Sequence, residues 1–325
     1  MVATLSKDTH LAMYQKMSLI KQNDDKIQFE MKTGKLMMPY YSARGQEVIP
    51  AAVSVNLNPD DYLVTVYRGI HDSLAKGLPL KDLWAELAGR ITGTCKGKGG
   101  PMHITHPETG VMVTTGIVGS GIPIACGLAL SSYYKKDGRV TISNFGDGAS
   151  NIGAFHEGLN LASIWQLPVV FVCANNRYAE HSAYEMGTAC ESVAKRADSY
   201  NMPGIRVDGN DPEAMHAVAK EAIDRARNGG GPTLIEAMTF RFCGHNIGDD
   251  SHYIPAEEMA AAKEADPLPR YRLWLQNNGF ATEAELADME ATIAEEINAA
   301  KEYAYSCDIP GAEELKRDVY AHELA

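Results

Sequence analysis

Three short polar segments of the chain contain the residue types that could bind an anionic ligand and move a proton. They are GDGASN (146–151), NNRY (175–178) and GHN (244–246). Each follows a stretch that is typical of a β-strand. Because ligands bind beyond the carboxyl ends of the strands in a parallel sheet, we expect the three segments to converge on one site.

The first two segments could hold a diphosphate together with its metal ion. Asp147 and Asn176 supply the hard oxygen ligands that Mg²⁺ prefers, while phosphate oxygens and water complete its octahedron. The glycines on either side of Asp147 let the backbone approach a ligand closely, and a helix opening behind them offers free N–H groups to phosphate. Taken singly, GDG could be an ordinary turn and NN an ordinary loop. Their joint placement at two strand ends favours the magnesium diphosphate.

His245 is the candidate for acid–base chemistry, because an imidazole changes its charge near neutral pH. An isolated histidine is more often a hydrogen-bonded structural residue. The position of His245 beside the two phosphate-type segments favours the catalytic role.

The elements that must position these segments alternate between strand and helix. Strands are predicted at 139–145, 167–174, 204–209 and 232–240, with helices after Asn151 and over 211–227. This alternation predicts an α/β fold with a parallel sheet covered by helices on both faces.

The remaining segments are less regular. The apolar spacing over 8–33 suits a helix that ends at Gly34, and 59–91 reads as turns followed by a helix. Residues 92–121 are rich in Gly and Thr and are expected to be long ordered loops. From residue 256 the chain is helical, and Thr282 with Glu285 forms a capping box.

Composition narrows the class of protein. The chain has 325 residues, of which 45% are hydrophobic, and a formal net charge of −12, which argues against a nucleic-acid binder. No apolar run approaches the ~20 residues that cross a bilayer, and the N-terminal residues do not resemble a signal peptide. The six cysteines are scattered without a C-x-x-C pair, which favours a reduced, cytoplasmic location.

The sequence resembles the α subunits of the first, thiamine-diphosphate-dependent component of 2-oxo-acid and acetoin dehydrogenase complexes. The GDG and NN pair is the magnesium and diphosphate motif of thiamine-diphosphate enzymes. The other matching segments, in chain order, are Gly45-Gln46-Glu47, Tyr67-Arg68, KGKGGPMH (96–103), Gly116-Ile117-Val118-Gly119, RFCGH (241–245) and DPLPR (266–270).

The resemblance implies a thiamine-diphosphate-binding fold and a role for each matching residue. Asp147, Asn176 and the carbonyl of Tyr178 would hold Mg²⁺. The residues implied to contact the diphosphate are Tyr67, Arg68, Gly148, Ala149 and His245. Gly116 and Val118 would meet the aminopyrimidine through backbone groups. Residues 1–255 would form this domain together with an N-terminal helix, and 256–325 a helical extension packed on it.

The resemblance also implies an activity and its partners. Such enzymes cleave a C–C bond next to a carbonyl through an enamine and pass the acyl group to a lipoyl-bearing acyltransferase component. In these enzymes the glutamate beside the aminopyrimidine comes from a separate β subunit. We find no pyrimidine-binding domain in this chain. We therefore expect an α₂β₂ heterotetramer, active only with β, that binds a small carbonyl substrate and neither nucleic acid nor membrane.

The sequence is less specific about which substrate the enzyme uses. The pattern Gly244-His245-x-x-Gly248-Asp249-x-x-x-Tyr253 is similar to acetoin dehydrogenase α subunits, although Ile254 stands where Arg is usual. The alternative is a pyruvate or branched-chain 2-oxo-acid dehydrogenase. Three positions near the expected substrate pocket or its regulatory site depart from the pyruvate pattern: Tyr41, Cys243 and Asn246. Asn246 replaces a serine that is phosphorylated in some relatives, so kinase control at this position is not expected.

Other classes fit the residues less well. A nicotinamide-binding Rossmann enzyme needs a third glycine where Asn151 stands. A zinc site at His103 and His106 lacks further ligands at metal spacing, and KGKGGP lacks the Lys-Ser/Thr ending of a P-loop. A purely structural subunit would not need Asp147, Asn176 and His245 together.

Overall fold

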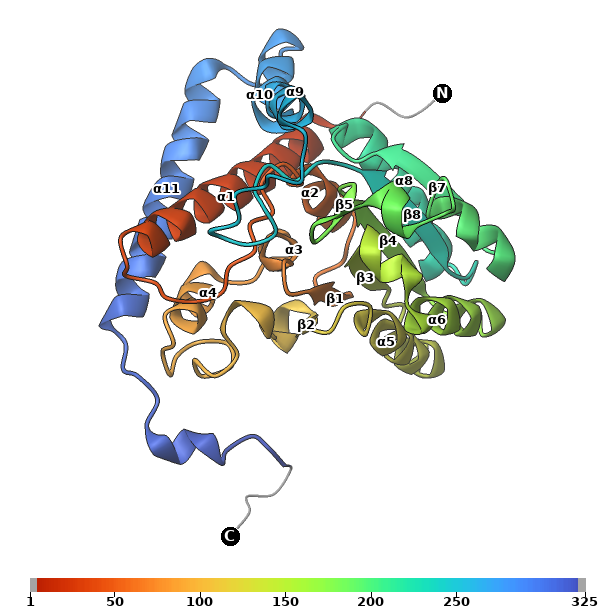
Figure 1. Ribbon diagram of the computed structural model, residues 1–325, viewed down its shortest axis with the longest axis horizontal. Helices are drawn as coiled ribbons and strands as arrows, with labels where there is room; N and C mark the ends of the chain where they lie inside the picture. The colour runs from red at the N-terminus through yellow and green to blue at the C-terminus, as the bar shows by residue number, and fades with distance from the viewer. Residues whose placement is uncertain (1–4, 321–325) are drawn as a thin grey trace.

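The computed structural model describes residues 5–320, and a six-stranded sheet forms its centre (Figure 1). The strand order is β2-β1-β3-β4-β8-β7, and every neighbouring pair is parallel. The bounds of these strands are β1 Tyr62–Val66, β2 Val111–Thr115, β3 Thr141–Gly146, β4 Val169–Asn175, β7 Gly204–Asp208 and β8 Thr233–Met238. The prediction of a parallel α/β sheet is confirmed.

Both faces of the sheet are buried under helices, as successive residues of β4 show. Val170 and Val172 face a core formed with α2 (Val48–Ser54) and α8 (Pro212–Arg227). Phe171 and its neighbours Val169 and Cys173 face the opposite core, which contains α5 (Gly121–Lys135) and α6 (Gly153–Ile164). Burial on both sides explains why this strand is an unbroken apolar run rather than an alternating one.

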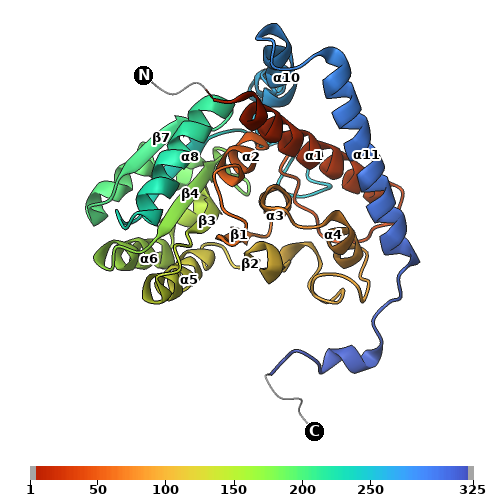
Figure 2. The same cartoon turned by 180° about the vertical axis from the view of Figure 1, so that it is seen from behind.

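Helices from the two ends of the chain pack together at one side of the molecule. The helix α11 (Glu283–Ser306) contacts α1 (Lys7–Lys32) and α4 (Leu80–Leu87), and both views show α11 alongside them (Figures 1 and 2). Their shared core includes Ile27, Trp84 and Ile297. The other helices are α3 Ile70–Lys76, α7 Tyr184–Gly187, α9 Ala256–Glu264 and α10 Pro267–Asn277.

Several sequence predictions can be compared directly with these bounds. The helix predicted over 8–33 is α1, and the capping box of Thr282 and Glu285 is present at the start of α11. The division at residues 255 and 256 stays a prediction, and its outer ends, 1–4 and 321–325, lie outside the described residues.

The sequence analysis missed two strands of the six-stranded sheet, β1 and β2. The interval 59–91 contains β1 and α3 before α4, and the loops expected over 92–121 were wrong where β2 forms. Both strands are only five residues long, and β2 lies at an edge with an irregular burial pattern. Their pairing with β3 and with each other, which is a long-range contact, stabilises them rather than a local pattern.

The buried carboxylate of Glu86 organises the KGKGGPMH loop. Its Oε1 accepts hydrogen bonds from the amides of Gly99 and Gly100 at 2.8 and 2.9 Å, and its Oε2 accepts from those of Cys95 and Gly97 at 2.7 and 2.9 Å. Four charge-assisted hydrogen bonds therefore hold an otherwise irregular loop in one conformation.

The two lysines of this loop are paired with the C-terminal segment. Lys96 and Lys98 lie 2.7 and 2.9 Å from Asp318 and also contact Glu314. These ion pairs join the loop to residues 314–318. Separately, none of the helices within residues 5–320 is both long and apolar enough to span a membrane.

Replacing Glu86 by Gln should destabilise the protein by about 3 kcal/mol, because one acceptor oxygen and the negative charge are lost to four partly buried amides. Chemical denaturation measures the change in the free energy of unfolding. Hydrogen exchange should accelerate at the four loop amides but not in the sheet. The matched control is Glu221→Gln on the exposed face of α8, and equal effects of the two substitutions would contradict this role.

Candidate functional site

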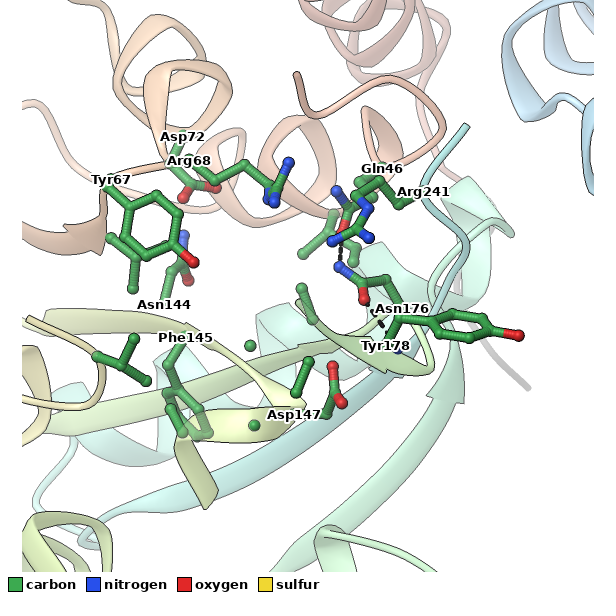
Figure 3. A pocket seen from close by; sticks show the side chains of 18 of the residues that line it. Gln46, Tyr67, Arg68, Asp72, Asn144, Phe145, Asp147, Asn176, Tyr178 and Arg241 are labelled. Atoms are coloured by element: carbon green, nitrogen blue, oxygen red, sulfur yellow. Dashed lines mark hydrogen bonds between the residues drawn. The ribbon is translucent and has the colours of Figure 1, made fainter. Parts of the chain in front are cut away.

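A cavity of about 260 Å³ lies beyond the carboxyl ends of β1, β3, β4 and β8 (Figure 3). Nine of the ten residues that the sequence analysis selected line it: Tyr67, Arg68, Val118, Asp147, Gly148, Ala149, Asn176, Tyr178 and His245. The exception is Gly116, which follows β2 and is not among the lining residues. The structure therefore brings together the three segments that were expected to converge.

Asp147 is the buried carboxylate of the cavity. It begins a 3₁₀ turn over Asp147–Asn151, and the helix predicted after Asn151 follows from Gly153. Its side chain is 2% exposed, and burial raises its pKa to about 6, although nearby backbone N–H groups and Arg241 act in the opposite direction. The carboxylate thus lacks the compensation that a bound cation would give.

Asn176 is fixed at both ends of its amide. Its Nδ2 donates to Oε1 of Gln46 at 3.1 Å, and its Oδ1 accepts from the backbone N–H of Tyr178 at 3.2 Å. The Tyr178 hydroxyl donates to Glu258 at 2.8 Å and points away from the cavity (Figure 3). Any contact of Tyr178 with a ligand would therefore involve its backbone.

Gly148 lies where the GDG turn packs closely against the segment that follows NN. A Cβ atom on Gly148 would lie 2.6 Å from the Cβ of Ala179, which is too short for two carbon atoms. Only glycine lets the GDG turn approach the segment that follows NN this closely.

Arg68 links three distant parts of the chain at the opposite wall. Its Nη1 donates to the carbonyl of Ser42 at 2.6 Å, and its Nη2 donates to the carbonyl of His245 at 2.9 Å. Burial lowers its pKa to about 10, so it remains a cation at neutral pH. The side chain is therefore a fixed positive charge beside the cavity.

His245 has an environment that favours the neutral imidazole. Burial first and the Arg68 charge second lower its pKa below the ordinary value. Its ring lies edge-on to Tyr41 and Tyr67, with ring centroids 5.2 and 6.1 Å away. A neutral imidazole at neutral pH can accept a proton, as a general base requires.

The Gly-His-x-x-Gly-Asp pattern positions the backbone of His245. Oδ2 of Asp249 accepts a hydrogen bond from the His245 N–H and another from the Tyr253 hydroxyl. A Cβ atom on Gly244 would lie 2.6 Å from the Asp249 Cβ, so glycine is required for this approach. The Ser251 N–H, which donates to Oδ1 of Asp249 at 2.8 Å, and these two hydrogen bonds hold the pKa of Asp249 down at about 2.

Sequence reasoning missed Gln46 and Arg241, although both lay within matching segments. Arg241 is 2% exposed and donates to the carbonyls of Cys243 and Glu180 at 3.0 and 3.1 Å, and to the Tyr253 hydroxyl at 2.8 Å. Both residues line the cavity. A buried cation and a buried amide are informative only once their tertiary surroundings are known.

Tyr41 and Cys243, which were expected near a substrate pocket, contact residues that line the cavity. Tyr41 packs edge-on against Tyr67 with ring centroids 4.6 Å apart, and the carbonyl of Cys243 accepts from Arg241. Neither is among the residues that line the cavity.

The lining residues fit a diphosphate with a divalent cation. Nε2 of Gln46 and Oδ1 of Asn144 are buried without a hydrogen-bond partner among the described residues. A phosphate oxygen would satisfy the first, and a cation would neutralise Asp147. No group of three or more His, Cys, Asp or Glu side chains within residues 5–320 is arranged to hold a metal. The candidate set instead combines one carboxylate with amide and backbone oxygens.

Comparisons with known proteins agree on one family. The family described as "Dehydrogenase E1 component" matches residues 15–313. The α subunit of acetoin:2,6-dichlorophenolindophenol oxidoreductase from Bacillus subtilis is 42% identical over 98% of this chain and 95% of its own length. Its counterpart from Cupriavidus necator is 38% identical over 97% of this chain and 95% of its own length. The pyruvate dehydrogenase E1 component α subunit of Porphyra purpurea is 35% identical, covering 98% and 94% respectively.

The chain therefore belongs to the dehydrogenase E1 component family. It is an α-subunit-type chain, and membership of the family implies an oxidoreductase that depends on thiamine diphosphate. The resemblance inferred from the motifs is confirmed.

Titration of Asp147 should make the ligand-free protein less stable as the pH rises. Unfolded Asp loses its proton near pH 3.8 and folded Asp147 near pH 6, so the free energy of unfolding falls between these values. The fall should be about 2–3 kcal/mol and level off at higher pH. Asp147→Asn should remove this slope and abolish the stabilisation by Mg²⁺ with thiamine diphosphate. Thermal melts across the pH range measure both, and an unchanged slope would contradict the assignment.

Breaking the Asp249 network should loosen the His245 loop without unfolding the sheet. Tyr253→Phe removes one hydrogen bond to Asp249 and acceptors for Arg241 and the His245 N–H, at a cost of about 1–2 kcal/mol. Amide exchange at residues 244–249 should accelerate while that of β4 stays slow. Tyr303→Phe on α11, which lies far from this loop in sequence, is the control; faster exchange throughout the chain would refute a local role.

Proposed function

We propose that this chain is the α subunit of an acetoin-cleaving dehydrogenase whose cavity holds the diphosphate of thiamine diphosphate through Mg²⁺. Asp147, Asn176 and the Tyr178 carbonyl hold the ion, while Tyr67, Arg68, Gly148, Ala149 and His245 contact the diphosphate. The observation that carries the proposal is the buried Asp147 carboxylate, whose raised pKa and lack of compensation suit a cation. Nε2 of Gln46, which has no hydrogen-bond partner among the described residues, supports the anion beside it.

The residues of the chain have separate roles in binding the cofactor and in proton transfer. Thiamine diphosphate supplies a stabilised carbanion for breaking the bond next to a carbonyl. Arg68 neutralises phosphate charge, and the backbone of Gly116 and Val118 meets the aminopyrimidine. His245, held by its backbone and neutral at neutral pH, exchanges a proton with the substrate carbonyl or hydroxyl.

The choice of acetoin rests on two observations. The names of the Bacillus and Cupriavidus relatives specify acetoin, and this chain shares the Gly-His-x-x-Gly-Asp pattern that predicted that branch. A pyruvate or branched-chain 2-oxo-acid substrate is the alternative, since a pyruvate dehydrogenase α subunit is also 35% identical.

A β subunit completes the enzyme, as the α-subunit names of the relatives indicate. The expected assembly is α₂β₂ in the cytoplasm, handing its acyl group to a lipoyl-bearing acyltransferase component. Apolar side chains stand exposed beside the cavity: Ile117 is 73% and Val118 45% exposed. Such residues favour coverage by a partner chain at this position.

The direct test is to express the chain alone and together with the β-type chain of its source genome. With Mg²⁺ and thiamine diphosphate, dye reduction by acetoin should require both chains. His245→Gln in the α chain should lower kcat about 100-fold while the assembly still forms, because a proton-transfer group is lost. Full activity of the α chain alone would refute the shared site. Greater activity with pyruvate or a branched-chain 2-oxo acid would show that the enzyme is a 2-oxo-acid dehydrogenase instead.

A further inference from the structure

A short hairpin reaches the mouth of the cavity beside His245. Its strands β5 (Tyr178–Ala179) and β6 (Ser182–Ala183) are antiparallel, and the turn between them consists of Glu180 and His181. Glu180 is one of the cavity-lining residues. Glu180 is an exposed residue at the edge of a cavity whose other charged lining residues are the cations Arg68 and Arg241 and the carboxylates Asp72 and Asp147.

The backbone of Glu180 is held in an uncommon conformation. Its φ of 55° lies in the left-handed region, which costs a non-glycine residue about 1–2 kcal/mol. Most two-residue turns place Gly, Asn or Asp at such a position. A strained glutamate at a ligand cavity is an observation that calls for a functional reason.

Contacts on both sides fix the turn relative to His245. Nη2 of Arg241 donates to the Glu180 carbonyl at 3.1 Å. The ring of His181 lies 4.7 Å from that of Tyr253, and its Nε2 lies 3.6 Å from Oδ2 of Asp249. These are the same side chains that hold the His245 loop, so the turn and the loop form one unit.

The Glu180 carboxylate is free to meet a ligand. Within residues 5–320 it forms no side-chain hydrogen bond or salt bridge. Burial is the largest influence on the pKa values of His245 and Tyr67, and the negative charge of Glu180 also acts on both: it opposes the lowering of the His245 pKa and adds to the raising of the Tyr67 pKa. The guanidinium of Arg241, by contrast, already donates to two carbonyls and a hydroxyl, and that of Arg68 donates to two carbonyls.

We propose that Glu180 is a specificity-determining residue that selects a neutral α-hydroxyketone over an anionic 2-oxo acid. Its carboxylate accepts a hydrogen bond from the substrate hydroxyl, which a 2-oxo acid lacks, and repels the substrate carboxylate. This inference rests on the proposed function, since it concerns the substrate end of the same site. Like charges brought close together repel each other, whereas a charge-assisted hydrogen bond is among the stronger kinds.

The test compares Glu180→Gln and Glu180→Ala with the unmodified enzyme in the complete α and β assembly. The ratio of kcat/KM for pyruvate to that for acetoin should rise about tenfold or more in both variants. Inhibition of acetoin turnover by pyruvate should strengthen to a similar degree. Glu185→Gln is the matched control: it removes the same charge from the same segment at a residue that is exposed, as Glu180 is, but does not line the cavity, and its ratio should not change.

The outcomes separate this inference from the proposed function. If the unmodified enzyme prefers acetoin but Glu180→Gln leaves the ratio unchanged, or Glu185→Gln shifts it equally, the role of Glu180 is refuted and the function stands. If the unmodified enzyme binds thiamine diphosphate but already prefers pyruvate, charge selection by Glu180 is refuted and the E1 class remains. If neither substrate reacts, both proposals fail. Thermal melting of each variant checks that the fold is intact.

Discussion

Parallel pairing of β1, β3, β4 and β8 is the constraint on which the rest of this structure depends. Parallel strands end at the same edge, so the segments that follow them meet there however far apart they lie in the chain. The two faces of the sheet are closed by separate apolar cores. The edge is therefore where the chain can gather polar groups around a ligand.

Burying charged and polar side chains at this edge costs free energy, and hydrogen bonds from the loops offset part of that cost. Arg68 and Arg241 are buried cations, and each donates to carbonyls of segments distant in sequence. Burying a charge is tolerated when its donors are satisfied. Asp147 and Gln46 keep unmet bonding capacity, so the remaining cost is concentrated where the proposed cation and phosphate bind.

The sequence predicted the centre of the sheet and most of the cavity because their signals are local. The long apolar run of β4 and the strand-type residues of β3 and β8 identify the centre of the sheet, and GDG and NN stand at the ends of β3 and β4. The short strands β1 and β2 lack such runs and depend on neighbours. Gln46 could not be assigned for a related reason: it meets Asn176 across 130 residues of chain, a contact that no local pattern encodes. Arg241 likewise acquires its role from Glu180 and Tyr253.

The Gly-His-x-x-Gly-Asp pattern determines the conformation of a loop, and this limits what the pattern can say about the substrate. Asp249 and Tyr253 bond the backbone N–H of His245 rather than its imidazole, so the pattern sets the shape of a loop. A loop shape can be shared by enzymes with different substrates. Discrimination between a hydroxyl and a carboxylate depends instead on polar or charged groups that line the cavity. The pattern and the substrate are therefore linked through the turn that packs on this loop, and the free carboxylate at that turn belongs to Glu180.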